Sequence, residues 1–189
     1  MVSLFKMHLH TGGADNVVVI WKSSGQGLLR YNHTAPIQRV RYNPLSLQLC
    51  SCSDTDFGLW NPEQKQVTKE KVGAKILAVA WSPDGATLAV GMQSGVISIR
   101  NQQGEETHRL ERRAPVWCMI FIPGTGSVQS ASKAAAAGGA TQAVVDGDIL
   151  AVGCWDKSLS MYRWVGPGTV ILHFFLYALY SSTYHIIRI

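Results

Sequence analysis

The sequence predicts an all-β chain of about three four-stranded antiparallel blades arranged as an open arc, which is a partial β-propeller. The first observation is a recurring strand-end residue, since Trp21, Trp60 and Arg100 are 39 and 40 residues apart. Prolines that follow apolar strands keep the same two spacings, at Pro44, Pro83 and Pro123. Two independent markers with one period indicate a repeated unit of short strands, typical of propeller blades.

The expected strands alternate with recognisable turns. Residues 14–21 form a β-branched run that ends on an aromatic residue, as buried strands do. The turn residues SSGQG at 23–27, Asn-Pro at 43–44 and SPDG at 82–85 separate the strands that follow. One four-stranded unit is predicted from strands at 28–31, 37–42, 47–52 and 57–60, and a second from strands at 67–71, 76–81, 87–91 and 96–100.

The third unit begins with strands at 107–111 and 116–122 and is then interrupted. Pro83 and Leu88 are five residues apart in the second unit, whereas Pro123 and Leu150 are 27 apart. The surplus contains the low-complexity run SASKAAAAGGATQ, which indicates a loop insertion at 124–148. We therefore expect repeat blades over residues 12–164, preceded by an unassigned segment at 1–11.

The last segment, residues 165–189, is a hydrophobic tail with a different character. Its part 169–189 has no acidic residue and is about as long as a membrane span, which needs roughly 20 apolar residues. Serine, threonine and histidine interrupt the run, and no basic flank orients it. An anchored chain that uses 169–189 therefore stays open as an alternative, and direct membrane contact is expected only through this tail.

Composition and motifs indicate a binding protein without chemistry of its own. The formal net charge is +5, but the basic residues are scattered, so no nucleic-acid partner is predicted. The four cysteines lack the paired spacing of a zinc site, and no phosphate-binding glycine loop or nucleophile elbow occurs. We predict that the chain is not an enzyme and has no catalytic residue, cofactor or metal.

The repeats resemble the WD-repeat family, whose blades share a loop histidine, a turn aspartate, a strand hydroxyl and a strand tryptophan. His33, Asp54 and Trp60 occupy three of these places, while the hydroxyl falls in Cys50-Ser51-Cys52-Ser53 without a choice between the serines. Partial matches occur at Asp15 with Trp21 and at Asp156. The resemblance implies that these residues hold blades together through hydrogen bonds and carry no chemistry.

The segments FGLWNPEQK and GVISIRN resemble, more specifically, the amino-terminal propeller of a subunit of intraflagellar transport complex A. This resemblance implies a scaffold in the cytoplasm and the cilium, at basal body and axoneme, that binds other complex A subunits and cargo adaptors. It also implies roles in retrograde transport, ciliary entry of membrane receptors and cilium assembly. A generic WD-repeat adaptor, such as a substrate receptor in ubiquitin ligation, is the other alternative, and the sequence does not identify the binding surface.

Overall fold

The computed structural model describes residues 2–5, 8–46, 48–61, 66–124, 147–164 and 170–177, and its strands form four antiparallel sheets. The first sheet contains β1 (Val2–Phe5), β2 (His8–Gly12), β3 (Val17–Lys22) and β4 (Gly27–Asn32). The second contains β5 (Arg39–Tyr42), β6 (Leu49–Cys52), β7 (Asp56–Asn61) and β8 (Gln66–Lys71). The third contains β9 (Ile76–Trp81), β10 (Thr87–Met92), β11 (Val96–Asn101) and β12 (Glu106–Glu111), and the fourth β13 (Val116–Ile122), β14 (Ile149–Cys154), β15 (Ser158–Trp164) and β16 (Val170–Tyr177).

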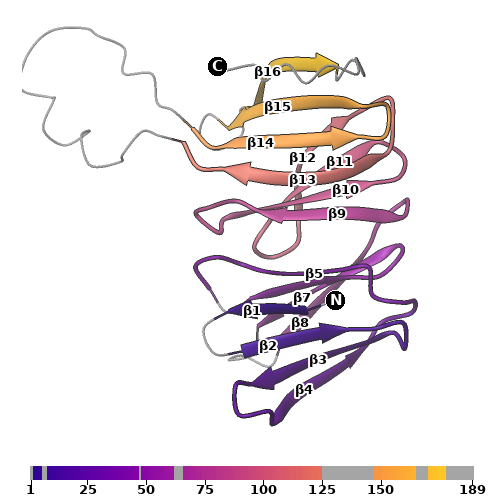
Figure 1. Cartoon of the computed structure of the whole chain (residues 1–189), viewed down its shortest axis with the longest axis vertical. Coiled ribbons are helices and arrows are strands. Elements are labelled where there is room, and N and C mark those ends of the chain that lie inside the picture. The colour runs from indigo at the N-terminus through magenta and orange to yellow at the C-terminus, as the bar shows by residue number, and fades with distance from the viewer. Residues whose placement is uncertain are drawn as a thin grey trace, which may run out of the picture.

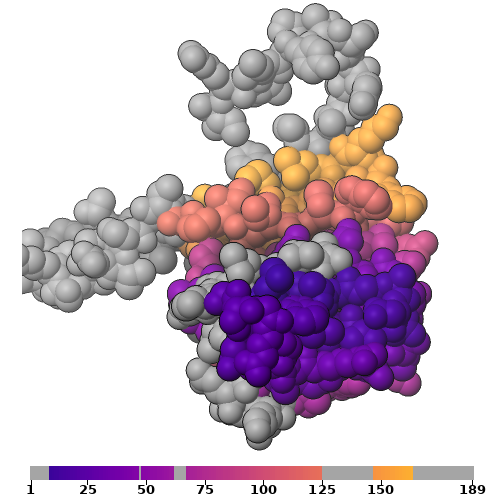
Figure 2. Space-filling view, turned by 60° about the horizontal axis from the view of Figure 1, so that its bottom comes forward, coloured from indigo at the N-terminus to yellow at the C-terminus, as the bar shows by residue number. Residues whose placement is uncertain are grey.

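The four sheets stack face to face in chain order, with the first and fourth sheets at opposite ends of the stack (Figure 1). The space-filling view likewise separates the indigo residues of the first sheet from the orange strands of the fourth (Figure 2). Each boundary between neighbouring sheets holds one cluster of buried apolar side chains. The core is therefore three apolar layers between four sheets.

The all-β, partial-propeller fold class is confirmed, and the predicted strands between residues 14 and 122 all appear within three residues of their expected ends. The grouping of strands differs. The strand near 28–31 is β4 of the first sheet, and the strand near 67–71 is β8 of the second. Each sheet thus begins one strand later than the sequence repeat. Four sheets form instead of three because strands from both ends of the chain complete the first and fourth sheets.

The two ends of the chain supply the additional strands. Within the segment left unassigned by sequence, β1 and β2 pair with each other and β2 pairs with β3. Within the hydrophobic tail, β16 pairs with β15 along its length. The β-branched and aromatic composition of residues 170–177 suits a strand, and no helix among the described residues is long and apolar enough to cross a membrane. Residues 125–146 of the insertion and 178–189 of the tail lie outside the described residues.

Candidate functional site: polar networks and exposed apolar surface

A buried chain of hydrogen bonds crosses the second sheet. The Trp60 indole donates to the Ser51 hydroxyl at 2.7 Å, and Ser51 lies 2.8 Å from Nε2 of His33. His33 Nδ1 lies 2.7 Å from a carboxylate oxygen of Asp56. Because an indole only donates and a carboxylate only accepts, a neutral His33 with its proton on Nδ1 satisfies every member in the order Trp60, Ser51, His33, Asp56.

Asp56 ends this chain and is held as a carboxylate. Burial by itself would raise its pKa, but hydrogen bonds from Ser53, His33 and Thr34 outweigh this effect and lower the pKa below its ordinary value. The Thr34 hydroxyl lies 2.7 Å from the second carboxylate oxygen. The network therefore ties the loop after β4 to the start of β7, which links the first sheet to the second.

The carboxylate in this place differs from the sequence prediction, which named Asp54. Asp54 instead accepts a hydrogen bond from the Gln38 side chain at 3.2 Å and lies 3.1 Å from the Lys75 ammonium. Asp54 lies in the turn between β6 and β7, whereas Asp56 is the first residue of β7 and faces His33. The other two residues named from the sequence, His33 and Trp60, both hydrogen-bond to the Ser51 hydroxyl, which lies between them.

The first sheet carries a shorter version of the same arrangement. The Trp21 indole donates to the Thr11 hydroxyl at 2.9 Å, and both residues occupy the positions that Trp60 and Ser51 hold in the second sheet. Asp15 accepts a hydrogen bond from the Val17 amide at 3.2 Å, which stabilises the turn before β3. Asp15 and Trp21 therefore support their blade separately, and Thr11 is a member that the sequence analysis missed.

Asp156 plays a turn role in the fourth sheet. Its carboxylate accepts from the Ser158 hydroxyl at 2.6 Å and from the Ser158 amide at 3.0 Å. The hydrogen bond from the Ser158 hydroxyl is the main reason why the pKa of Asp156 is lowered. Arg112, from the segment after β12, donates to the same hydroxyl at 3.3 Å, so this turn is fastened to the third sheet.

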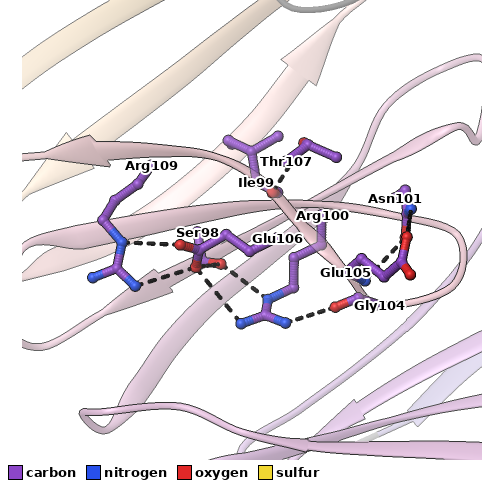
Figure 3. Close-up of polar contacts among 9 residues, drawn as sticks. All are labelled: Ser98, Ile99, Arg100, Asn101, Gly104, Glu105, Glu106, Thr107 and Arg109. Atoms are coloured by element: carbon purple, nitrogen blue, oxygen red, sulfur yellow. Dashed lines mark hydrogen bonds and ion pairs between the residues drawn. The ribbon is translucent and has the colours of Figure 1, made fainter.

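A different network replaces the histidine set in the third sheet (Figure 3). Arg100 stands where Trp60 stands in the second sheet, and its guanidinium donates to Ser98 Oγ at 2.9 Å and to the Gly104 carbonyl at 2.6 Å. Glu106 accepts from Ser98 at 2.5 Å and from Nε of Arg109 at 3.0 Å. Burial opposes ionisation of Glu106, but the hydrogen bonds from Arg109 and Ser98 and both guanidinium charges lower its pKa.

Arg100 also contacts the neighbouring sheet. Its guanidinium carbon lies 5.0 Å from the centre of the Phe57 ring, which belongs to β7. A guanidinium over an aromatic face is attracted by the ring, by about 0.5–2 kcal/mol depending on desolvation. The arginine thus bonds within the third sheet and packs on the second, so the replaced network still joins two blades.

These polar groups have no reactive arrangement among the described residues. No group of three or more histidine, cysteine, aspartate or glutamate side chains there could hold a metal ion. A cavity of about 380 Å³ is lined mostly by amides and hydroxyls and by no carboxylate or histidine, with Ser46, Gln48, Asn61, Thr68 and Gln102 among its residues. Such a lining offers hydrogen bonds but no general acid, base or nucleophile pair.

The fourth sheet carries most of the large apolar side chains that are exposed in the described part of the chain. Trp117 and Trp155 are each 55% exposed, and their ring centres are 5.6 Å apart with a tilt of 58°. Ile120, Ile122 and Leu159 are also exposed. Exposed apolar patches of this kind mark interaction surfaces, and tryptophan is enriched among residues that dominate binding.

Stacked four-stranded antiparallel sheets joined by tryptophan, hydroxyl and histidine networks define a WD-repeat propeller segment. The family model described as the IFT122 first beta-propeller matches residues 3–174, and the chain belongs to this family. Intraflagellar transport protein 122 homologues are 42% identical over 160 residues in Danio rerio and 49% identical over 117 residues in Homo sapiens. These matches cover 82% and 60% of this chain but only 12% and 9% of the relatives, so the chain spans a small part of their length.

Solved structures share the fold at low identity. A chain of the mitotic checkpoint complex is 16% identical with a TM-score of 0.71, and the match covers 96% of this chain and 52% of that one. The computationally designed Ika4 protein is 16% identical with a TM-score of 0.67, and the match covers 87% of this chain and 89% of Ika4. For the designed Ika8 protein the TM-score is 0.66 at 17% identity, with 89% of this chain and 46% of Ika8 covered.

Proposed function

We propose that the chain is a non-enzymatic scaffold of intraflagellar transport complex A that acts by binding other proteins. The observation that carries this proposal is the match of the IFT122 first-propeller model to residues 3–174. Its partners are other complex A subunits and cargo adaptors, and its location is the cytoplasm and the cilium, at basal body and axoneme. Through these contacts it supports retrograde transport, ciliary entry of membrane receptors and cilium assembly.

The geometry favours binding over catalysis because the buried histidine and carboxylate of the second sheet already have internal partners. His33 and Asp56, the pair that most resembles a catalytic dyad, are closed in by Ser51, Ser53 and Thr34. The side chain of His33 is fully buried, so a substrate would have to displace a satisfied network to reach it. A rigid stack of sheets with such fixed joints is suited to present loops and exposed side chains to partners.

The tryptophan pair of the fourth sheet is the candidate contact residue set. Trp117 belongs to β13, and Trp155 begins the turn between β14 and β15, where its amide donates to the Pro115 carbonyl at 3.0 Å. The backbone on both sides of the pair is therefore fixed, which reduces the entropy lost when a partner orders the rings. Two large rings held in this way can be buried by a partner protein.

The test is affinity capture of complex A subunits by the full tagged chain expressed in ciliated cells. We expect capture by the unchanged chain and a loss of roughly 30-fold or more in affinity for Trp117→Ala/Trp155→Ala, the size expected for a binding hot spot. Leu45→Ala is the matched control, since Leu45 is 64% exposed but lies in the second sheet's β5–β6 loop. Failure of the unchanged chain to capture any complex A subunit would contradict the scaffold function. Equal capture by all three chains would show that the tryptophan pair does not contact these subunits.

A further inference from the structure

Each inner sheet buries the same two faces, as the pairing registers show. We call the face turned toward the next sheet the forward face and the opposite one the rear face. In the second sheet the forward face carries the paired residues Cys50–Leu59 and Cys52–Phe57, all at most 3% exposed. The corresponding pair in the third sheet is Ala89–Ile99, which is fully buried against the fourth.

The forward face of the fourth sheet has the same apolar chemistry without the burial. The register places the pairs Ala151–Met161 and Gly153–Leu159 on it, and Ile120 pairs with Ala151 from the edge strand β13. Leu159 is 39% exposed, although its counterparts by register, Phe57 and Ile97, are fully buried. Ile120 is 62% exposed, at a place where the third sheet has the buried Ala80 and the second sheet the exposed Arg41. An exposed leucine in a position that is fully buried in the second and third sheets indicates a face that another sheet covers.

The rear face of the first sheet is the other end of the stack. The pairs Leu9–Trp21 and Thr11–Val19 lie on it, in the places that Leu49–Trp60 and Ser51–Gly58 hold on the buried rear face of the second sheet. The Trp21 indole and Thr11 hydroxyl satisfy each other, so burial of this face strands neither group. An open hollow of about 230 Å³, lined by Val19, Gly27, Leu28, Leu29 and Arg30, lies in this sheet.

We propose that two copies of this chain assemble head to tail, with the forward face of the fourth sheet of each packed on the rear face of the first sheet of the other. The same chain supplies both faces, and three boundaries inside it already join a forward face to a rear face. The dimer thus repeats an existing contact twice. The designed Ika8 chain and the checkpoint-complex chain, of which this chain covers 46% and 52%, show that the fold accommodates about twice this span.

The contact joins two different faces, so it is heterologous and closes only when both junctions form. A blocked forward face and a blocked rear face should therefore have the same effect on the assembly. The two kinds of variant should also complement each other. A chain with a blocked rear face keeps its forward face, and this face can pack on the intact rear face of a chain whose forward face is blocked. A like-to-like dimer through the fourth sheet would show neither property.

The experiment measures the mass of the full chain by light scattering and sedimentation in reducing buffer, because Cys118 is exposed. We expect twice the 20.6 kDa chain mass for the unchanged protein and for the control Leu45→Arg. Leu159→Arg and Val19→Arg should each give the single-chain mass, and their equimolar mixture should return to two chains with weaker association. Circular dichroism checks that each variant keeps its strands, and Met161→Arg, on the same face, replaces Leu159→Arg if the latter does not fold.

Three outcomes would overturn the proposal. The first is an unchanged chain that stays at the single-chain mass at all concentrations. The second is a Val19→Arg variant that is still a dimer, and the third is a mixture of the two variants that does not associate. If the chain is monomeric alone but Leu159→Arg abolishes capture of complex A subunits, the forward face binds another protein instead of a second copy.

Discussion

Removal of the Ser51 hydroxyl should destabilise the chain by an amount that the network geometry sets. Ser51, Trp60 and the His33 side chain are all fully buried, so Ser51→Ala leaves the Trp60 indole N–H and Nε2 of His33 without partners. Each stranded buried group costs about 1–3 kcal/mol, which gives about 2–6 kcal/mol in total for the two groups. The substitution leaves little cavity, so this loss comes from polar groups and not from packing.

The assay is urea unfolding followed by tryptophan fluorescence, with the free energy of unfolding taken from the midpoint at unchanged slope. Ser160→Ala is the matched control, because Ser160 is equally buried in β15 but its hydroxyl has no hydrogen-bond partner among the described residues. Its removal should leave stability unchanged or slightly improved. The reasoning would be refuted if the two variants unfolded within about 0.5 kcal/mol of each other, the usual size of a neutral substitution.

Three further predictions concern charge and packing. Asp56 has a lowered pKa in the folded chain, so its stabilising effect is present above its ordinary pKa of 3.8 and is lost as the pH falls through its pKa in the folded chain. Asp56→Asn should therefore make the free energy of unfolding less dependent on pH at the acid end of the curve. Gly91→Ala would place a methyl 2.6 Å from a β13 side chain and should cost about 1–3 kcal/mol in thermal unfolding, whereas Gly73→Ala meets no atom within 4 Å and should be near neutral. Arg100→Lys should cost about 1–3 kcal/mol in urea unfolding because lysine cannot make the forked contacts. Arg109→Ala, at a side chain 54% exposed, should have a much smaller effect, and equal losses would contradict this difference.

The strands could be predicted because local residues determine them. Turn residues such as those at 43–44 and 82–85 end the strands, and the β-branched runs between them have no competing helical period. The grouping into sheets could not be predicted in the same way. The sequence repeat that ends at Trp60 gives the order of the strands along the chain. It does not determine which of these strands is the first strand of a sheet.

The polar networks show a similar limit. The sequence SDTD offers two aspartates, and the spacing to Trp60 favours Asp54 by analogy with Asp15 and Trp21. The choice of Asp56 depends on His33, which comes from a separate loop and reaches only the first residue of β7. Thr11 was missed because it is ten residues before Trp21, whereas Ser51 is nine before Trp60, and only the strand register makes the two equivalent.

The one-strand offset between sequence repeat and sheet has a consequence for dissecting this chain. A truncation placed after Trp60, where the repeat ends, would remove β8 from the second sheet and leave a three-stranded remnant with an unpaired β7. A protease cut between β8 and β9, near Gly73, would instead separate two complete sheets. Fragments designed on sheet boundaries should therefore be recovered intact more often than fragments designed on the tryptophan spacing, and limited proteolysis should favour the same junctions.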